Sequence, residues 1–174
     1  MDTLETDRLL LRLFRESDLD TYAEMCADPE VMRFLNGYPL SREEAWRNLA
    51  MVVGHWHLRG FGLWAVEEKS TGCLIGRVGC WKPEGWPGME IAWTLRRESW
   101  GRGYATEAAK VALRYAFDVL RQKHVISLIH PENTPSIRVA QRIGQRLEGR
   151  NEVMGSTVLV YGARPPRPTV IRPA

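Results

Sequence analysis

Cysteine is scarce in this sequence, and the few cysteines present form no pattern. There are three, Cys26, Cys73 and Cys80, an odd number in which no two make a C-x-x-C pair. This distribution argues against a disulfide framework and a cysteine zinc site, and it predicts a reducing compartment. The four histidines show no metal-ligand spacing relative to the cysteines. We therefore expect no metal.

The chain also lacks long hydrophobic runs and a strong excess of one charge. No apolar run is long enough to span a bilayer. Residues 1–5 are acidic, unlike a signal peptide, so we expect a cytoplasmic protein with no membrane partner. The net charge of +3 is mildly basic and suits an ordinary surface, an anionic coenzyme or a nucleic acid. Interleaved basic and aromatic runs are absent, which disfavours a nucleic acid partner and leaves only the Arg-Pro tail to suggest RNA or ribosome binding.

Helix and strand signals run through most of the 174 residues in a single series. We predict one domain, residues 1–162, followed by a Pro/Arg-rich tail, residues 163–174, that forms an extended arm. The order is strand, two helices, three strands, helix, strand, helix and two strands, a mixed α+β arrangement. The expected strands are 8–14, 63–68, 73–81, 89–95, 125–129, 147–150 and 156–162, and the expected helices have caps at Ser17, Ser41 and Thr134 and a further start at Gly103.

The stretch from Ser99 to Ala108 organises this series. Gly101 and Gly103 lie between a predicted strand and a strongly helical run that lasts to about Leu120. Glycines at such a point let the backbone turn tightly, and the free N–H groups and positive dipole end of the helix suit a phosphate. The stretch lacks the third glycine of a dinucleotide-binding fold and the Gly-Lys-Ser/Thr ending of a P-loop. We read it as a loop for the pyrophosphate of a coenzyme, although a glycine pair can also simply close a strand–helix connection.

The Trp-Gly-x-Gly-Tyr-Ala-Thr-Glu-Ala form of this stretch resembles the coenzyme A loop of the GNAT superfamily of N-acetyltransferases. It looks like the branch that holds ribosomal-protein N-terminal acetyltransferases. The order of elements resembles the GNAT fold from Leu4 to Gly162 and implies a mixed, mostly antiparallel sheet flanked by helices. The resemblance further implies acetyl-CoA as cosubstrate. The acetyl group would move directly, in a ternary complex, to a primary amine of a small molecule or a protein N-terminus.

The resemblance also assigns residues to the coenzyme. Backbone N–H groups of the loop would face the pyrophosphate, and Arg102 would add charge; the loop residues are Gly101, Arg102, Gly103, Tyr104, Ala105 and Thr106. Glu98 stands where familiar GNAT loops carry Gln or Arg, so a side-chain contact to phosphate is not expected there. The pantetheine arm would lie along the strand 91–95, with backbone of Trp93 and Leu95 meeting the thioester oxygen, while plain core is the other interpretation of Trp93. Asn133 resembles the residue that binds the pantetheine amide, and it also fits an ordinary turn.

Two residues are candidates for proton transfer. Glu90 is a lone carboxylate at the start of an apolar strand, and relatives often carry Glu in this motif. It would accept the proton of the amine through water, bind a cationic substrate, or simply lie exposed at a strand end. Many relatives protonate the thiolate with a Tyr, but that position holds Ala140 here. Ser136 lies three residues after Asn133, as in the ribosomal-protein branch, and either donates to the sulfur or bonds to backbone in the first helical turn.

The acceptor pocket is the part that the sequence describes least. By resemblance, Phe34, Asn36 and Tyr38 and the helix that begins at Ser41 should flank it. Four of the seven tryptophans are either an aromatic cleft or core; these are Trp46, Trp56, Trp81 and Trp86. A non-catalytic acyl-CoA-binding module is the alternative function, supported by the departures at Glu98 and Ala140. The final strands should be exposed, and such an edge allows two chains to pair as a homodimer.

Overall fold

The computed structural model describes residues 3–166, which form one eight-stranded sheet with helices on both faces. The strand order is β1-β2-β3-β4-β5-β6-β8-β7, and every pair is antiparallel except β5 and β6. The strands are β1 (Leu4–Glu5), β2 (Leu9–Arg12), β3 (Leu63–Glu68), β4 (Cys73–Trp81), β5 (Glu90–Leu95), β6 (Val125–Ile129), β7 (Arg146–Val153) and β8 (Ser156–Ala163). The α+β arrangement expected from the sequence is confirmed, with β1 as an additional short edge strand.

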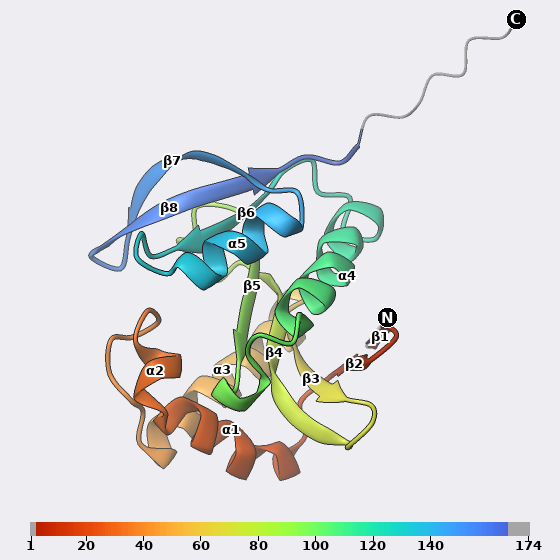
Figure 1. Ribbon diagram of the computed structural model, residues 1–174, viewed down its shortest axis with the longest axis vertical. Coiled ribbons are helices and arrows are strands. Elements are labelled where there is room, and N and C mark those ends of the chain that lie inside the picture. Colours follow the sequence, from red (N-terminus) through yellow and green to blue (C-terminus); the bar gives the residue numbers. More distant parts are fainter. Residues whose placement is uncertain (1–2, 167–174) are drawn as a thin grey trace, which may run out of the picture.

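Five α-helices and two short 3-10 turns connect these strands. The helices are α1 (Leu19–Ala27), α2 (Pro29–Met32), α3 (Arg42–Arg59), α4 (Tyr104–Asp118) and α5 (Thr134–Arg142), and the turns are Glu16–Asp18 and Arg97–Ser99. In Figure 1, β5 runs through the middle of the molecule, with α1, α2 and α3 near one end and β6, β7, β8 and α5 near the other. Among residues 3–166 no helix is both long and apolar enough to cross a membrane.

Alternation along β3 explains why the sheet is covered on both faces. Trp64 and Val66 are fully buried in a cluster with the apolar side of α4, whereas Ala65 between them is buried against α1, α2 and α3. Successive side chains of a strand point to opposite faces, so an uninterrupted apolar strand requires helices on both sides. The wide apolar face of α4 therefore packs on the centre of the sheet, as its pattern predicted.

The helix caps follow the sequence signals with two corrections. Ser41 forms the predicted capping box, with its Oγ accepting from the N–H of Glu44 at 3.2 Å and its own N–H donating to the Glu44 carboxylate at 2.8 Å. Ser17 is not a cap, because it lies inside the 3-10 turn that precedes α1. Thr134 is the first residue of α5, and the cap is Asn133, whose Oδ1 accepts from the N–H of Ser136 at 3.2 Å.

The two ends of the sheet bear on the remaining predictions. Strand β7 lies at one edge of the sheet, and nearly all of its side chains are exposed. It therefore offers the open edge from which pairing of two chains was expected, and the homodimer stays a prediction. Ala163, which we had placed in the tail, is the last residue of β8. Residues 167–174 of the predicted arm lie outside the described residues.

Candidate active site

The parallel strands β5 and β6 separate almost as soon as they meet. Their ladder holds one residue pair, Glu90 with Ile126, where the N–H of Ile126 donates to the carbonyl of Met89 at 2.8 Å. A regular parallel ladder would next join the N–H of Leu128 to the carbonyl of Ile91. Instead, Leu128 donates to the Glu90 carboxylate at 3.1 Å, and Ile91 accepts from the Ser127 hydroxyl at 2.6 Å. Two side chains thus replace the ladder bonds and leave a gap beyond Glu90.

The backbone of Trp93 faces this gap. The N–H of Arg96 donates to the carbonyl of Ile75 in β4. In an antiparallel pair every second residue bonds to the neighbouring strand, so the even-numbered residues of β5 are the ones that bond to β4. The odd-numbered residues must then point their N–H and C=O groups toward β6. The carbonyl of Leu95 is already taken by the Trp100 indole N–H at 2.9 Å. The N–H and C=O of Trp93 and the N–H of Leu95 remain directed into the gap, available to an extended ligand.

The side chain of Trp93 reaches across the gap and also packs against two clusters of the core, so its core interpretation holds in part. It is half-buried, and its indole N–H donates to the Ser136 hydroxyl at 3.2 Å. Ala92 and Thr94 are half-exposed as well, although β5 has a neighbouring strand on each side. Central strands are normally the most buried part of a sheet. The middle of β5 therefore remains accessible from both faces.

The glycine loop has the backbone geometry expected for a phosphate cradle. Gly101 and Gly103 have φ of +74° and +81°, values that strongly favour glycine. Gly103 is the cap of α4, and the first N–H that bonds back into the helix is that of Glu107, which donates to Gly103 at 3.0 Å. The N–H groups of Tyr104, Ala105 and Thr106 are thus the free donors of the helix N-terminus. Such a terminus favours an anion.

The side chains of the loop are engaged elsewhere. Arg102 pairs with Glu68 at 2.9 Å and lies over the Tyr104 ring, and the Tyr104 hydroxyl donates to the same carboxylate oxygen. The bond from Tyr104 is the main cause that lowers the pKa of Glu68, and the same bond raises the pKa of Tyr104. These contacts fix the loop to the end of β3. Glu98 is exposed and lies 3.6 Å from Arg96. The charge expected from Arg102 therefore already has a partner.

A shallow pocket of about 560 Å³ lies beside the first turns of α4, and its lining mixes basic side chains with the acidic Glu5, Asp7 and Glu107. The pocket is lined by Gly103, Thr106, Glu107, Lys110, Arg114 and Arg142, together with residues 5–7 of the N-terminal segment. Glu107 is held by Thr6 at 2.6 Å and by Arg8 at 2.8 Å, which ties the N-terminal strands to α4. Glu5 pairs with Lys69 and Glu107 with Arg8, so Lys110, Arg114 and Arg142 outnumber the remaining carboxylate, Asp7, in a pocket that also includes Gly103 and Thr106 of the loop.

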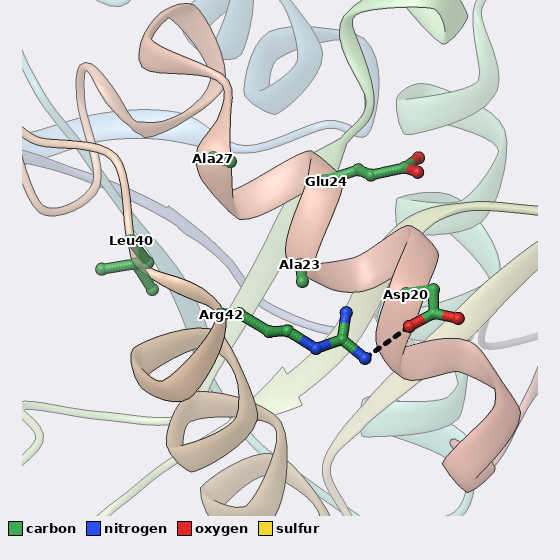
Figure 2. Close-up of a pocket in the computed structure, with 6 residues that line it drawn as sticks. All are labelled: Asp20, Ala23, Glu24, Ala27, Leu40 and Arg42. Carbon is green, nitrogen blue, oxygen red and sulfur yellow. Dashed lines mark hydrogen bonds and ion pairs between the residues drawn. The ribbon is translucent and has the colours of Figure 1, made fainter.

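A second recess lies between α1 and the start of α3 and contains none of the candidate residues. Figure 2 shows Arg42 reaching across it to Asp20, at 2.5 Å, with Ala23 and Leu40 nearby. Its volume is about 420 Å³. Both charged partners are exposed, so their attraction is weak in water.

Glu90 is buried, which rules out the exposed strand end considered from the sequence. Its side chain is 6% exposed, and its two oxygens accept from Leu128 at 3.1 Å and from the Trp86 indole at 2.7 Å. Burial raises the pKa of Glu90 to about 7, and the two hydrogen bonds and the charge of Arg77 oppose this rise. A carboxyl group of that pKa can accept a proton near neutral pH. Of the four tryptophans considered, Trp86 hydrogen-bonds to the Glu90 carboxyl group, and Trp81 stands opposite Glu90 on the neighbouring strand β4.

Ser136 and Asn133 lie together on the other side of the gap. The hydroxyl of Ser136 accepts from Trp93, so its own proton is free for another acceptor. Asn133 uses its Oδ1 as the helix cap and keeps its amide N–H groups without a partner among residues 3–166. Ala140, which stands at the Tyr position of many relatives, is fully buried beside Ile129 and Tyr161. Ser136 is therefore the hydroxyl that the structure places next to Trp93.

The acceptor residues expected from the sequence lie on the loop between α2 and α3. Phe34 stacks on His130, which follows β6, with ring centroids 5.0 Å apart. It is half-buried, whereas Asn36 is exposed and Tyr38 is 55% exposed. The structure thus brings Phe34 to the β6 side of the gap and leaves the other two at the surface. Their substrate-binding role stays a prediction.

Two residues near the site escaped the sequence analysis, Glu68 and Arg77. Arg77 is the lone charge within the apolar strand β4, which is the same kind of signal that singled out Glu90. Its Nη1 donates to Tyr22 at 2.6 Å and to Asn48 at 2.8 Å. Glu68 ends β3, and apart from a local bond from Thr71 its carboxylate binds Arg102 and Tyr104, which lie more than thirty residues away and could not be paired with it from the sequence.

Comparison with known proteins identifies this arrangement. The family model described as an acetyltransferase (GNAT) domain matches residues 8–146. The uncharacterized N-acetyltransferase YnaD of Bacillus subtilis is 32% identical over 146 residues, 84% of each chain. An acetyltransferase from Agrobacterium tumefaciens is 31% identical, with a TM-score of 0.85 over 94% of this chain and 95% of that one. Mycobacterium smegmatis RimJ, solved with CoA-disulfide, shares the fold at 18% identity and a TM-score of 0.72, covering 90% of this chain and 82% of its own. The chain therefore belongs to the GNAT family and is an acetyltransferase, as the loop of residues 100–108 indicated.

Proposed function

We propose that this enzyme transfers an acetyl group from acetyl-CoA directly to a primary amine, within a complex that holds both substrates. The gap between β5 and β6 carries the proposal, because it combines an unpaired backbone edge at Trp93 with a buried carboxyl at Glu90. The family uses acetyl-CoA, and the residues present fit that cosubstrate. No cluster of metal-binding side chains occurs among residues 3–166.

The coenzyme would be held at two places. The free N–H groups of Tyr104, Ala105 and Thr106 would bind the pyrophosphate, because the glycines at 101 and 103 bring the backbone close without a side chain. Lys110, Arg114 and Arg142 would provide positive charge for the nucleotide end. The open backbone of Trp93 and Leu95 would pair with the amide-bearing pantetheine arm as a strand edge pairs with a peptide, and the Asn133 amide would add a polar contact.

Three groups would then act on the reaction. The N–H of Trp93 would donate to the carbonyl oxygen of the thioester, where negative charge develops. Glu90 would take a proton from the acceptor's ammonium group, directly or through one water, and the neutral amine so formed would attack the thioester carbonyl carbon. The hydroxyl of Ser136, whose proton is free, would donate to the departing sulfur. Acetyl-CoA supplies the activated acyl group, and the chain supplies position and proton transfer.

The test combines thiol release from acetyl-CoA with calorimetric binding of acetyl-CoA. The acceptors would be amino acids, polyamines and peptides with different first residues. We expect turnover with one class of amine, and Glu90→Gln should lower that turnover by roughly 100- to 1,000-fold while acetyl-CoA still binds. Glu84→Gln is the matched control, because that carboxylate is 96% exposed and lies six residues before Glu90, in the connection after β4.

Full turnover by Glu90→Gln would remove Glu90 from the mechanism. Tight binding of acetyl-CoA without thiol release over the whole panel would favour the non-catalytic acyl-CoA-binding module.

A further inference from the structure

Arg77 is a half-buried cation on β4 without an anionic partner. It stands opposite Thr94 of β5, on the sheet face covered by α1 and α3. Its hydrogen bonds go to the hydroxyl of Tyr22 and the amide oxygen of Asn48, and Tyr22 donates in turn to Asn48 at 2.6 Å. Among residues 3–166 no carboxylate lies within ion-pair distance of Arg77. A half-buried arginine held only by neutral groups keeps its positive charge available to an anion.

Arg12 shows how this protein neutralises an arginine that serves only the fold. Its guanidinium meets Asp18 at 2.8 Å and Glu67 at 2.8 Å, and the side chain is 9% exposed. Arg77 lies on the same sheet but is held by two neutral groups. Tyr22 is fully buried, and burial raises its pKa to about 12, so it carries no charge at neutral pH. The positive charge of Arg77 is therefore fixed in place but not compensated.

The remaining donors of Arg77 are open to a ligand. A guanidinium has five N–H donors in a rigid fork that matches a carboxylate. Its hydrogen bonds to Tyr22 and Asn48 both use Nη1, and neither Nε nor Nη2 is an enclosed atom without a partner. These two nitrogens are therefore reachable by solvent. Tyr22 and Asn48 bind Nη1 of the guanidinium and leave Nε and Nη2 free.

These free donors belong to a residue on the same face as Glu90, opposite Thr94, which follows Trp93 in β5. Thr94, opposite Arg77, and Ala92, two residues nearer to Glu90, are the half-exposed side chains on this face of β5. Glu90 points to the same face by alternation, and the charge of Arg77 acts on its carboxyl group. An amine that approaches the backbone of Trp93 from this face thus has Glu90 on one side and Arg77 on the other.

We propose that Arg77 binds a carboxylate of the acceptor, so that the acceptor is a small amine that carries its own carboxylate, an amino acid. This inference rests on the proposed function and narrows its acceptor. The acceptor ammonium would face Glu90, and its carboxylate would take the two free donors of Arg77. A polyamine would place a second positive charge against Arg77 and is disfavoured.

The experiment compares each of a panel of free amino acids with its own carboxamide, and with spermidine, by thiol release from acetyl-CoA. The wild-type enzyme should prefer acid to amide by roughly 10- to 100-fold in kcat/KM, the range of a hydrogen bond to a charged group. In Arg77→Gln the acid-to-amide ratio should fall to near one. Arg47→Gln is the matched control, because it removes an exposed arginine next to Asn48 and should keep the ratio.

The outcomes separate the two proposals. Binding of acetyl-CoA, measured by calorimetry, would confirm that Arg77→Gln is folded. The acid-to-amide ratio of the wild-type enzyme is itself a test and needs no variant. A wild-type ratio near one, a preference for spermidine, or an unchanged ratio in folded Arg77→Gln would overturn the role of Arg77 while the acetyltransferase proposal stands. Binding of acetyl-CoA without turnover of any amine would overturn the proposed function, and this inference with it.

Discussion

The buried carboxyl of Glu90 makes stability depend on pH in a way that can be measured. Its pKa is 4.5 for an ordinary glutamate and about 7 in the folded protein, mainly because burial disfavours the charged form. Below the lower value both the folded and the unfolded chain hold the proton. Between the two values the unfolded chain releases it first, so the free energy of unfolding falls as pH rises. Above the folded value the loss is complete.

The size of this loss follows from the shift. Each pKa unit corresponds to 1.36 kcal/mol, so the change from 4.5 to about 7 amounts to about 3 kcal/mol. Urea unfolding of wild type and Glu90→Gln between pH 4 and pH 8 would measure it, because glutamine stays neutral throughout. Replacing one acceptor oxygen by an amide also disturbs the bonds to Trp86 and Leu128, but that cost is the same at every pH. Between pH 4 and pH 8 the free energy of unfolding of wild type should therefore fall by about 3 kcal/mol relative to that of Glu90→Gln.

Two results would refute this reasoning. A difference that stays flat from pH 4 to pH 8 would mean that Glu90 keeps an ordinary pKa. The same drift in Glu84→Gln relative to wild type would assign the effect to general surface charge, because that side chain is exposed. As a kinetic counterpart, kcat/KM should rise with pH through an apparent pKa near 7, as expected for a base that must lose its proton.

Three further changes test the loop and the proton donor. Gly103→Ala places a side chain at φ +81°, which should lower the free energy of unfolding by about 1–3 kcal/mol and weaken acetyl-CoA binding. Gly54→Ala, within α3, is the control and should leave stability unchanged or raise it. Equal effects of the two changes would refute the backbone argument. Glu68→Gln should raise the acetyl-CoA Kd about three- to tenfold in calorimetry, because the loop loses the carboxylate that binds Arg102 and Tyr104. Tighter binding would instead mean that Arg102, once released from Glu68, reaches the phosphates. Ser136→Ala should lower kcat by about 10- to 100-fold with acetyl-CoA binding kept, and an unchanged kcat would exclude the hydroxyl as donor.

Local signals were sufficient where the physics is local. The capping box of Ser41 and the glycines at 101 and 103 depend on residues within one helical turn, and the structure has them as predicted. The two errors at helix starts are also local in origin. Asp18 is drawn to Arg12, and Asn133 competes with Thr134 as the cap. Several side chains near a helix start can serve as caps, and the spacing alone does not choose among them.

Contacts between distant segments were beyond the reach of the sequence. The pattern of β5 and β6 indicates two buried strands, but it does not indicate that they separate after one residue pair. That separation depends on Glu90 and Ser127 taking ladder positions on the neighbouring strand. The partners of Arg77 lie on α1 and α3, 55 and 29 residues away in sequence. A lone charge in an apolar strand singled out Glu90 in β5. The same signal was available for Arg77 in β4 but was not applied there.

The same carboxylate opens the sheet and is placed to perform the chemistry, and this links the fold to the function. An open gap between two parallel strands leaves N–H and C=O groups without partners, which is costly if they are buried. Glu90 satisfies the N–H of Leu128, and Ser127 satisfies the carbonyl of Ile91, so the gap begins without an orphaned group at its apex. The groups left open, at Trp93 and Leu95, lie further along the gap, where the middle of β5 is accessible to solvent or ligand. Replacing Glu90 by an apolar residue would therefore remove a base and orphan the N–H of Leu128 together, whereas glutamine separates these two effects because its side-chain oxygen still accepts a hydrogen bond.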